Sequence, residues 1–179
     1  MENLAPSHQL FHSFCVRPRA KFESQMPGED VILLIRAHPV TQLPWVINGL
    51  FLFILLILLN FLFSSYLSTS QILYINVSSV VFIFAYYWFK FLSYFFNAGV
   101  VTQRRIVDID FHAVIYKEVT EAQIKNVEDI TAKSGGYFSS LFNYGNVYVQ
   151  TAGAHVNIEY ENVPRPGDVV KIINQAIRS

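Results

Sequence analysis

The strongest constraint in the sequence is a run of 53 residues, 37–89, that contains no Asp, Glu, Lys or Arg. Most of these residues are Leu, Phe, Ile, Val or Tyr, and a small soluble core cannot bury so long an apolar stretch. Since a bilayer core about 30 Å thick needs about 20 apolar residues per helical crossing, the run fits two crossings. A serine-rich break at 64–71 predicts a tight turn between helices at 44–67 and 72–96. We therefore expect a two-helix transmembrane hairpin over 44–96.

Composition agrees with a membrane protein and excludes several other classes. Hydrophobic residues make up 53% of the chain and charged residues 15%, against about 25% charged residues in a typical soluble domain. Lys plus Arg and Asp plus Glu number 13 each, so no overall field draws the protein to nucleic acid. The single cysteine, Cys15, excludes an internal disulfide framework and a cysteine-based metal cluster.

The basic residues near the helix ends predict the side of the membrane on which each terminus lies. Arg36 precedes the first helix, and the connecting turn has no Lys or Arg. Lys90, Arg104 and Arg105 lie at or after the second helix. Because cytoplasmic flanks are enriched in Lys and Arg, we expect both termini in the cytoplasm and the hairpin in the plasma (inner) membrane. In this arrangement Arg104 and Arg105 would contact anionic headgroups.

Aromatic residues near the same helix ends predict anchors at the inner interface. Trp45 lies near the start of the first helix, and Trp88 and Tyr94 lie near the end of the second. Indole and phenol rings favour the headgroup level, and the ammonium group of Lys90 can extend from there to water. Trp45, Trp88, Lys90 and Tyr94 are therefore the predicted membrane-interface anchors.

Two asparagines are expected to pair within the membrane. Asn60 and Asn76 lie eight residues on either side of Ser68, and therefore at similar depth in the two helices. Hydrogen bonds between such side chains, worth about 0.6 to 2 kcal/mol, either close the hairpin or join it to a second copy. The absence of ionisable residues deep in the run disfavours a transport core. The alternative is an oligomeric scaffold, or a pore-forming or transport-associated subunit, assembled through Asn48, Asn60 and Asn76.

The segment before the hairpin divides into two parts. Residues 1–27 contain three prolines and scattered aromatic residues without a sustained period, which predicts a flexible N-terminal arm. The alternative is that the aromatics Phe11 and Phe14 lie on the membrane surface or dock on the C-terminal domain. In the juxtamembrane segment 28–43, the β-branched run 31–35 predicts a short strand or an interfacial segment.

From residue 97 onward the pattern changes to the alternation of half-buried strands. Residues 107–112 and 156–161 alternate apolar with charged or polar side chains, and Val147 and Val149 continue the pattern. The apolar residues of 169–176 then recur with the spacing of an amphipathic helix. Residues 97–179 are therefore expected to form a small α+β domain, an antiparallel β barrel or sandwich with a C-terminal capping helix.

Two groups of residues in this region resemble a known family. The first group is Tyr94, Asn97, Val100, Val101, Thr102, Arg105 and Ile106, and the second is Phe142, Tyr144, Gly145, Asn146, Val147, Thr151 and Ala152. Both resemble motifs of the bacterial pleckstrin-homology-like (PH-like) domains found on small membrane proteins. The lead-in at Arg36, His38 and Pro39 resembles members with a two-helix anchor. The resemblance spans 28–177 and implies two nearly orthogonal small sheets capped by the C-terminal helix.

The resemblance does not predict lipid recognition. Eukaryotic relatives of this fold bind phosphoinositides through clustered Lys and Arg in the first hairpin, whereas bacterial members of this kind generally have no established ligand. Residues 97–179 carry eight Lys or Arg and nine Asp or Glu, without such a cluster. A specific phosphoinositide site is therefore not expected.

The sequence predicts neither catalysis nor a cofactor. Asp108 and Asp110 share one face of a strand, as an acid-base pair or a metal site requires, but alternating charges on an exposed strand also serve solubility. The sequence has no phosphate-binding loop, nucleophile elbow or zinc-ligand spacing. We therefore expect a non-catalytic, membrane-anchored module that presents a β-rich domain at the inner leaflet. Its expected partners are the lipid bilayer and either another protein or a second copy of the chain.

Overall fold

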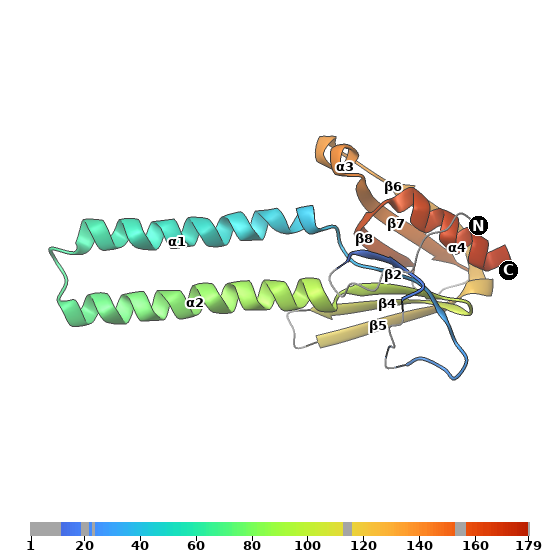
Figure 1. Ribbon diagram of the computed structural model, residues 1–179, viewed down its shortest axis with the longest axis horizontal. Helices are drawn as coiled ribbons and strands as arrows, with labels where there is room; N and C mark the ends of the chain where they lie inside the picture. Colours follow the sequence, from blue (N-terminus) through green and yellow to red (C-terminus); the bar gives the residue numbers. More distant parts are fainter. Residues whose placement is uncertain (1–11, 19–21, 23, 113–115, 153–156, 179) are drawn as a thin grey trace.

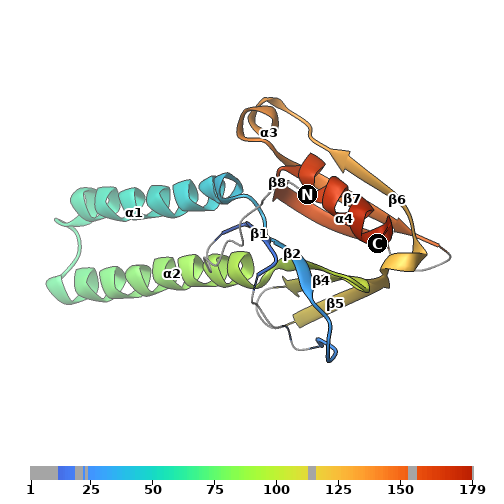
Figure 2. The same cartoon turned by 45° about the vertical axis from the view of Figure 1, so that its right-hand side comes forward.

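The structure consists of a helical hairpin that projects from one end of a two-sheet domain (Figure 1). It is a computed structural model that describes residues 12–18, 22, 24–112, 116–152 and 157–178. The hairpin is formed by α1, Leu43–Phe63, and α2, Thr69–Phe96, and a short 3-10 helix, η1, Pro39–Gln42, leads into α1. In both views the sheets lie beyond the same end of the hairpin (Figure 2).

Local capping determines where the second helix begins. The hydroxyl of Ser68 accepts a hydrogen bond from the backbone N–H of Gln71 at 3.4 Å, and Gln71 Oε1 accepts one from the backbone N–H of Ser68 at 2.9 Å. This reciprocal pair is a capping box, which satisfies backbone donors that the first helical turn leaves open. As a result α2 starts at Thr69 rather than at 72. The first helix, α1, ends at Phe63 rather than at 67.

Both hairpin helices are long and apolar enough to cross a membrane, by length and composition. Most of their Leu, Ile, Val and Phe side chains are exposed instead of being packed in a protein core. A helix that is apolar around its whole circumference requires an apolar environment on every side. The hairpin helices therefore have the length and the exposed apolar surface that membrane spans require.

The described residues contain eight strands in two antiparallel sheets. The first sheet has the order β1-β2-β3-β4-β5, and its strands are Phe14–Val16, Val31–Ile35, Ala98–Thr102, Arg105–His112 and Tyr116–Gln123. The second has the order β6-β7-β8, with strands Val127–Lys133, Tyr144–Thr151 and Ile158–Pro164. The remaining segments are η2, Ile124–Asn126, between the sheets, α3, Tyr137–Phe142, between β6 and β7, and α4, Pro166–Arg178.

The hydrophobic core lies between the two sheets and α4. Its fully buried side chains come from all three layers: Leu33, Ile35, Val101, Ile106, Val147, Val149, Ile158, Val169 and Ile173. Among the described strands, none pairs with both sheets, because β5 passes through η2 into β6 without a ladder between them. The domain is therefore an open two-sheet structure, and the predicted alternative of a closed barrel is wrong.

Several elements predicted from the sequence are confirmed. The alternating run 107–112 lies in β4, and the C-terminal helix buries Val169 and Ile173 as its spacing predicts. The run 31–35 is a strand, β2, and not an interfacial segment.

The domain also includes strands from before the hairpin. β2 pairs antiparallel with β3, with Ile35 opposite Gly99, and the side chains of Leu33 and Ile35 are fully buried. The hairpin is thus inserted between two neighbouring strands of one sheet. This corrects the domain boundary predicted at residue 97, which would cut the sheet between β2 and β3.

The described part of the N-terminal arm is ordered as β1. This strand pairs with β2, with Cys15 opposite Leu34, and Cys15 is buried while Phe14 packs against the core. The pairing satisfies backbone groups of β2 that an edge strand would leave open. A flexible arm is therefore the wrong prediction for Phe14–Val16, and residues 1–11, 19–21 and 23 lie outside the described residues.

Candidate binding groove at the base of the hairpin

The two connections between the hairpin and the first sheet, from β2 to α1 and from α2 to β3, are both short. β2 ends at Ile35 and is followed by three residues before η1, while a single residue, Asn97, separates α2 from β3. The side-chain oxygen of Asn97 accepts a hydrogen bond from the backbone N–H of Phe111 at 2.7 Å. The ring of Phe111 also lies 5.2 Å from that of Phe96. Two paired strands thus hold both helices, so that the hairpin has a fixed direction relative to the domain.

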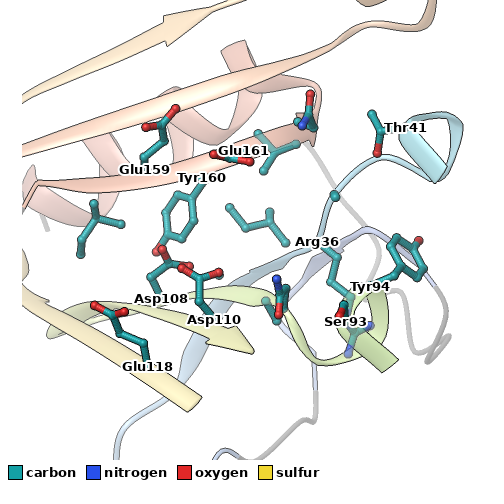
Figure 3. Close-up of a pocket in the computed structure, with 18 of the residues that line it drawn as sticks. Arg36, Thr41, Ser93, Tyr94, Asp108, Asp110, Glu118, Glu159, Tyr160 and Glu161 are labelled. Atoms are coloured by element: carbon teal, nitrogen blue, oxygen red, sulfur yellow. The ribbon is translucent and has the colours of Figure 1, made fainter. Parts of the chain in front are cut away.

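A groove of about 640 Å³ lies at this junction, between the domain-side ends of the hairpin helices and strands β4, β5 and β8 (Figure 3). Five acidic residues line its domain side, and we refer to them as the acidic wall: Asp108, Asp110, Glu118, Glu159 and Glu161. The Glu159 carboxylate is turned toward β7, where it accepts a hydrogen bond from Asn146 Nδ2 at 3.0 Å. The hairpin side contributes the residues Trp45, Lys90, Ser93 and Tyr94 together with Arg36 from the segment after β2. The groove is therefore acidic on one side and basic and aromatic on the other.

Strand register explains why the acidic wall forms. Asp108 and Asp110 alternate with buried positions of β4 and so share a face, and Asp110 lies directly opposite Glu118 on β5. β8 brings Glu159 and Glu161 to the same groove from the second sheet. Like charges directly opposite one another destabilise an antiparallel pair. The sheet therefore tolerates an electrostatic cost at this position.

The floor of the groove is a close contact between the two sheets. A Cβ atom on Gly99 would lie 2.3 Å from the ring of Tyr160, so only glycine permits this approach. The Tyr160 hydroxyl crosses to the first sheet and donates a hydrogen bond to the carbonyl oxygen of Val107 at 3.1 Å. Figure 3 shows the Tyr160 ring directed toward Asp108 and Asp110.

Burial and mutual repulsion perturb the ionisation of this region. Burial raises the pKa of Asp108 from 3.8 to about 7, and the neighbouring charges of Asp110, Glu161 and Glu118 act in the same direction. Burial also raises the pKa of Tyr160 well above its usual value, with Asp108 and Asp110 adding to the shift. The acidic wall is therefore a place where a proton or a cationic group is favoured.

On the basic side of the groove, the side chain of Arg36 is held in place by stacking on an aromatic ring. The guanidinium of Arg36 lies 5.0 Å from the ring centroid of Phe95, and burial lowers the pKa of Arg36. The Tyr94 hydroxyl lies 3.4 Å from Ser13 Oγ, which ties the last turns of α2 to the N-terminal strand. Among the described residues, no three His, Cys, Asp or Glu side chains are placed to share a metal ion. The arrangement is therefore suited to charged groups of a larger ligand.

The predicted anchors lie at the domain end of the hairpin. Trp45 Nε1 donates a hydrogen bond to Gln42 Oε1 at 2.7 Å, and its ring meets that of Tyr87 edge-on at 5.5 Å. Trp88 is exposed and stacks on Phe84 at 6.2 Å. Lys90 is exposed and, with Tyr94, borders the groove.

The two predicted membrane asparagines contact each other within one hairpin. Asn60 Nδ2 donates to Asn76 Oδ1 at 2.7 Å, and Asn76 Nδ2 donates to Asn60 Oδ1 at 2.8 Å. Each amide also donates to a carbonyl one turn earlier in its own helix, that of Leu56 or Ile72. The four bonds use all four N–H donors of the two amides, within a single chain.

The predicted headgroup contact is wrong for Arg105, and the position of Arg104 does not favour it. Arg105 is buried and forms ion pairs with Glu29 at 2.9 Å and Glu121 at 2.6 Å. Arg104 is exposed, but the turn after β3 lies at the end of the domain that is far from the hairpin (Figure 1). The error arises because β3 runs away from α2, and each residue of a strand adds about 3.3 Å.

Sequence reasoning missed both the buried ion pair and the groove. Hydrogen bonds from Arg105 and Thr102 lower the pKa of Glu29 to about 2, yet Glu29 and Arg105 are separated by the whole hairpin in sequence. Alternation alone predicts that Asp108 and Asp110 form an exposed, soluble face, because the approach of Glu118 and of β8 to them depends on strand register and sheet packing. The only feature of the sequence that pointed to the groove was the alternation of apolar and acidic residues in β4.

Two antiparallel sheets closed by a C-terminal helix, joined to a helical hairpin, define the chain as a PH-like α+β protein. A family model described as "Bacterial PH domain" matches residues 38–177. The chain therefore belongs to the bacterial PH domain family, as the sequence motifs predicted. The match includes both hairpin helices as well as most of the domain. In the same comparisons no curated protein and no solved structure matches the chain.

Proposed function

We propose that this chain is a non-catalytic, membrane-anchored adaptor whose groove binds a basic segment of another membrane protein. The hairpin spans the inner membrane, both termini are cytoplasmic, and the PH-like domain lies against the inner leaflet. The observation that carries the proposal is the continuity of paired strands β2 and β3 with α1 and α2. These connections, one residue on one side and three residues plus η1 on the other, are too short to let the domain move away from the bilayer.

Helix length and charge support the membrane placement. At 1.5 Å per residue, the 21 residues of α1 extend about 32 Å and the 28 residues of α2 about 42 Å, enough to cross a core of about 30 Å. Arg36 and Lys90 lie at the domain end, while the connecting turn carries no Lys or Arg. The enrichment of Lys and Arg on the cytoplasmic side favours a domain inside the cell.

The acidic wall supports a basic protein ligand. Anionic lipid headgroups are repelled by these carboxylates, so the groove does not suit the lipids beside it. Cytoplasmic segments next to membrane spans are enriched in Lys and Arg, and they lie at the same height above the bilayer as the groove. A membrane protein with such a segment therefore has the charge and the position that the acidic wall requires.

A photo-crosslinking residue at Thr120, which borders the groove, tests this binding in membranes of intact cells. We expect a reproducible foreign membrane protein to be captured through a Lys- or Arg-rich segment beside its span. Charge reversal by Asp110→Lys with Glu118→Lys should abolish this capture. The matched control, Glu128→Lys with Asp129→Lys on β6, lies outside the groove and should leave capture unchanged.

Two outcomes would refute the basic-ligand proposal. One is capture of the same segment by the charge-reversed protein, provided that its thermal midpoint matches the wild type. The other is capture of a second copy of the chain alone, which would favour the alternative of an oligomeric scaffold or pore. That alternative has less support, because Asn60 and Asn76 use their amides within one hairpin.

A further inference from the structure

The short helix α3 carries an apolar surface that the rest of the chain leaves uncovered. Tyr137, Phe138 and Leu141 are 80%, 65% and 62% exposed, and Phe142 is 40% exposed. The opposite side of the helix is attached to the domain through Ser139, which is buried. No residue from 134 to 143 carries a charge. Four large apolar side chains on a six-residue helix are unfavourable in water, and such patches usually contact another molecule.

Contacts with the segment before α1 place α3 at the base of the hairpin. The imidazole of His38 stacks on Tyr144 with ring centroids 5.7 Å apart, and its centroid lies 6.5 Å from that of Phe142. The backbone N–H of His38 donates to the carbonyl oxygen of Asn162 at 2.7 Å. His38 is also the N-cap of η1, which leads directly into α1. The end of α3 is therefore attached to the point where the chain enters the hairpin.

Both views show the same placement of α3. In Figure 1 and Figure 2 it lies at the edge of the domain that faces the hairpin, beyond the sheets and beside the first turns of α1. A plane perpendicular to the hairpin at the start of α1 would therefore pass close to α3. The β3–β4 turn, by contrast, lies at the opposite end of the domain.

We propose that α3 is a third membrane contact, which inserts Tyr137, Phe138 and Leu141 into the interface of the inner leaflet beside α1. The inference rests on the proposed function, since it requires that the hairpin span a bilayer. The surface that covers α3 is assigned to lipid because α3 lies at the same height along the hairpin as the start of α1, where the hairpin leaves the membrane. Uncharged aromatic and leucine side chains are the residues that interfacial segments bury at headgroup depth.

This contact would determine how the domain sits on the bilayer. The hairpin continues only into the first sheet, through β2 and β3, whereas α3 belongs to the second sheet, between β6 and β7. With α3 inserted, both sheets are held at the membrane from opposite sides of the groove. The insertion would keep the groove facing along the membrane surface, toward segments that emerge beside it.

Site-specific fluorescence in the full-length protein tests the insertion. The protein is reconstituted in vesicles of phosphatidylethanolamine and phosphatidylglycerol, in a Cys15→Ala background with one nitrobenzoxadiazole label at Phe138→Cys or Leu141→Cys. A label at Phe82→Cys in α2 is the reference for a lipid environment. A label at Gln103→Cys in the β3–β4 turn is the reference for water. We expect nitroxide lipids to quench labels at 138 and 141, and iodide quenching there to fall at least about threefold below that at 103.

Each other outcome has a distinct meaning. If the label at 82 is quenched by lipid while those at 138 and 141 are quenched by iodide as strongly as that at 103, the insertion is refuted and the anchor stands. If the labels at 138 and 141 are shielded from both quenchers, protein covers α3 and the lipid assignment is likewise overturned. A label at 82 that lipid does not quench would refute membrane anchoring itself.

Discussion

At the scale of single residues, the acidic wall concentrates repulsion that the fold does not need. Asp110 faces Glu118 directly across β4 and β5, and Asp108 is half-buried next to both. Neutral side chains at these positions would remove the repulsion between them. Carboxylates that lower the stability of the fold but line a groove are the groups that would bind a cationic ligand.

This repulsion predicts an unusual dependence of stability on pH. The folded-state pKa of Asp108 is raised from 3.8 to about 7, so between these values the folded state retains a proton that the unfolded state has released. The free energy of unfolding should therefore fall as pH rises from about 4.5 to about 7, by at most about 4 kcal/mol. Below pH 4.5 Glu29, whose pKa is lowered to about 2, reverses the trend as it is protonated.

Asp108→Asn isolates the contribution of this carboxyl group. The substitution should flatten the decline between pH 4.5 and 7 and raise the thermal midpoint at pH 8 by several degrees. Unfolding of the detergent-solubilised protein, followed by circular dichroism over that pH range, measures both effects. Glu128→Gln, on an exposed position of β6, should leave the profile unchanged. An unchanged profile for Asp108→Asn would show that Asp108 is ionised normally.

Arg104 and Arg105 allow a matched test of the buried ion pairs, because they are adjacent in sequence and only Arg105 is buried. Arg105→Ala leaves Glu29 buried without its cation and should lower the free energy of unfolding by about 3 to 5 kcal/mol. Arg104→Ala removes an exposed charge one residue away and should change it by less than about 0.5 kcal/mol. Denaturant unfolding of both variants gives the comparison, and equal effects would contradict the structural role of Arg105.

At the scale of elements, the sequence predicted those structures that depend on local pattern. The hairpin, β4 and α4 follow from apolar length, alternation and helical spacing, and their identities are confirmed. β1 was missed because three residues are too few for a period, and its order comes from pairing with β2. The groove was missed because it joins residues from before and after the hairpin, and sequence pattern does not specify such contacts.

Pairing of the hairpin helices can be measured through the two asparagines. Replacing Asn60 or Asn76 by Ala removes both hydrogen bonds between the two amides, together with the bond of the replaced amide to its own helix, and leaves the other amide without its partner. A double-mutant cycle should give a coupling energy of about 0.6 to 2 kcal/mol in reversible unfolding by dodecyl sulfate. Asn48→Ala, at an exposed position of α1, serves as the control. A coupling energy of zero would mean that the two side chains do not pair in the membrane.

At the scale of the whole molecule, the sequence of the domain is divided in two by the helical hairpin. Cys15, Val31, Leu33 and Ile35 are buried in the domain, so residues 97–179 alone lack these four core side chains and the strand that pairs with β3. Each of the aliphatic side chains among them contributes about 1.5 to 3 kcal/mol through burial. We expect the fragment 97–179 to be unfolded or aggregated.

A variant without the hairpin provides the matched test. Replacing residues 37–97 by a short Asn-Gly turn joins β2 to β3 in the register that places Ile35 opposite Gly99. This variant should be soluble and monomeric with a cooperative unfolding transition, measured by gel filtration and circular dichroism. Cooperative unfolding of the fragment 97–179 would show instead that β1 and β2 are dispensable.

The central claim is that the hairpin crosses the inner membrane and holds the domain on its cytoplasmic side. Single cysteines at Ser65, in the connecting turn, and at Gln103, at the far end of the domain, test it directly in a Cys15→Ala background. A membrane-impermeant maleimide should label position 65 in cells with a permeabilised outer membrane and an intact inner membrane. It should label position 103 only after the inner membrane is broken. Labelling of position 103 in cells with an intact inner membrane would contradict the claim.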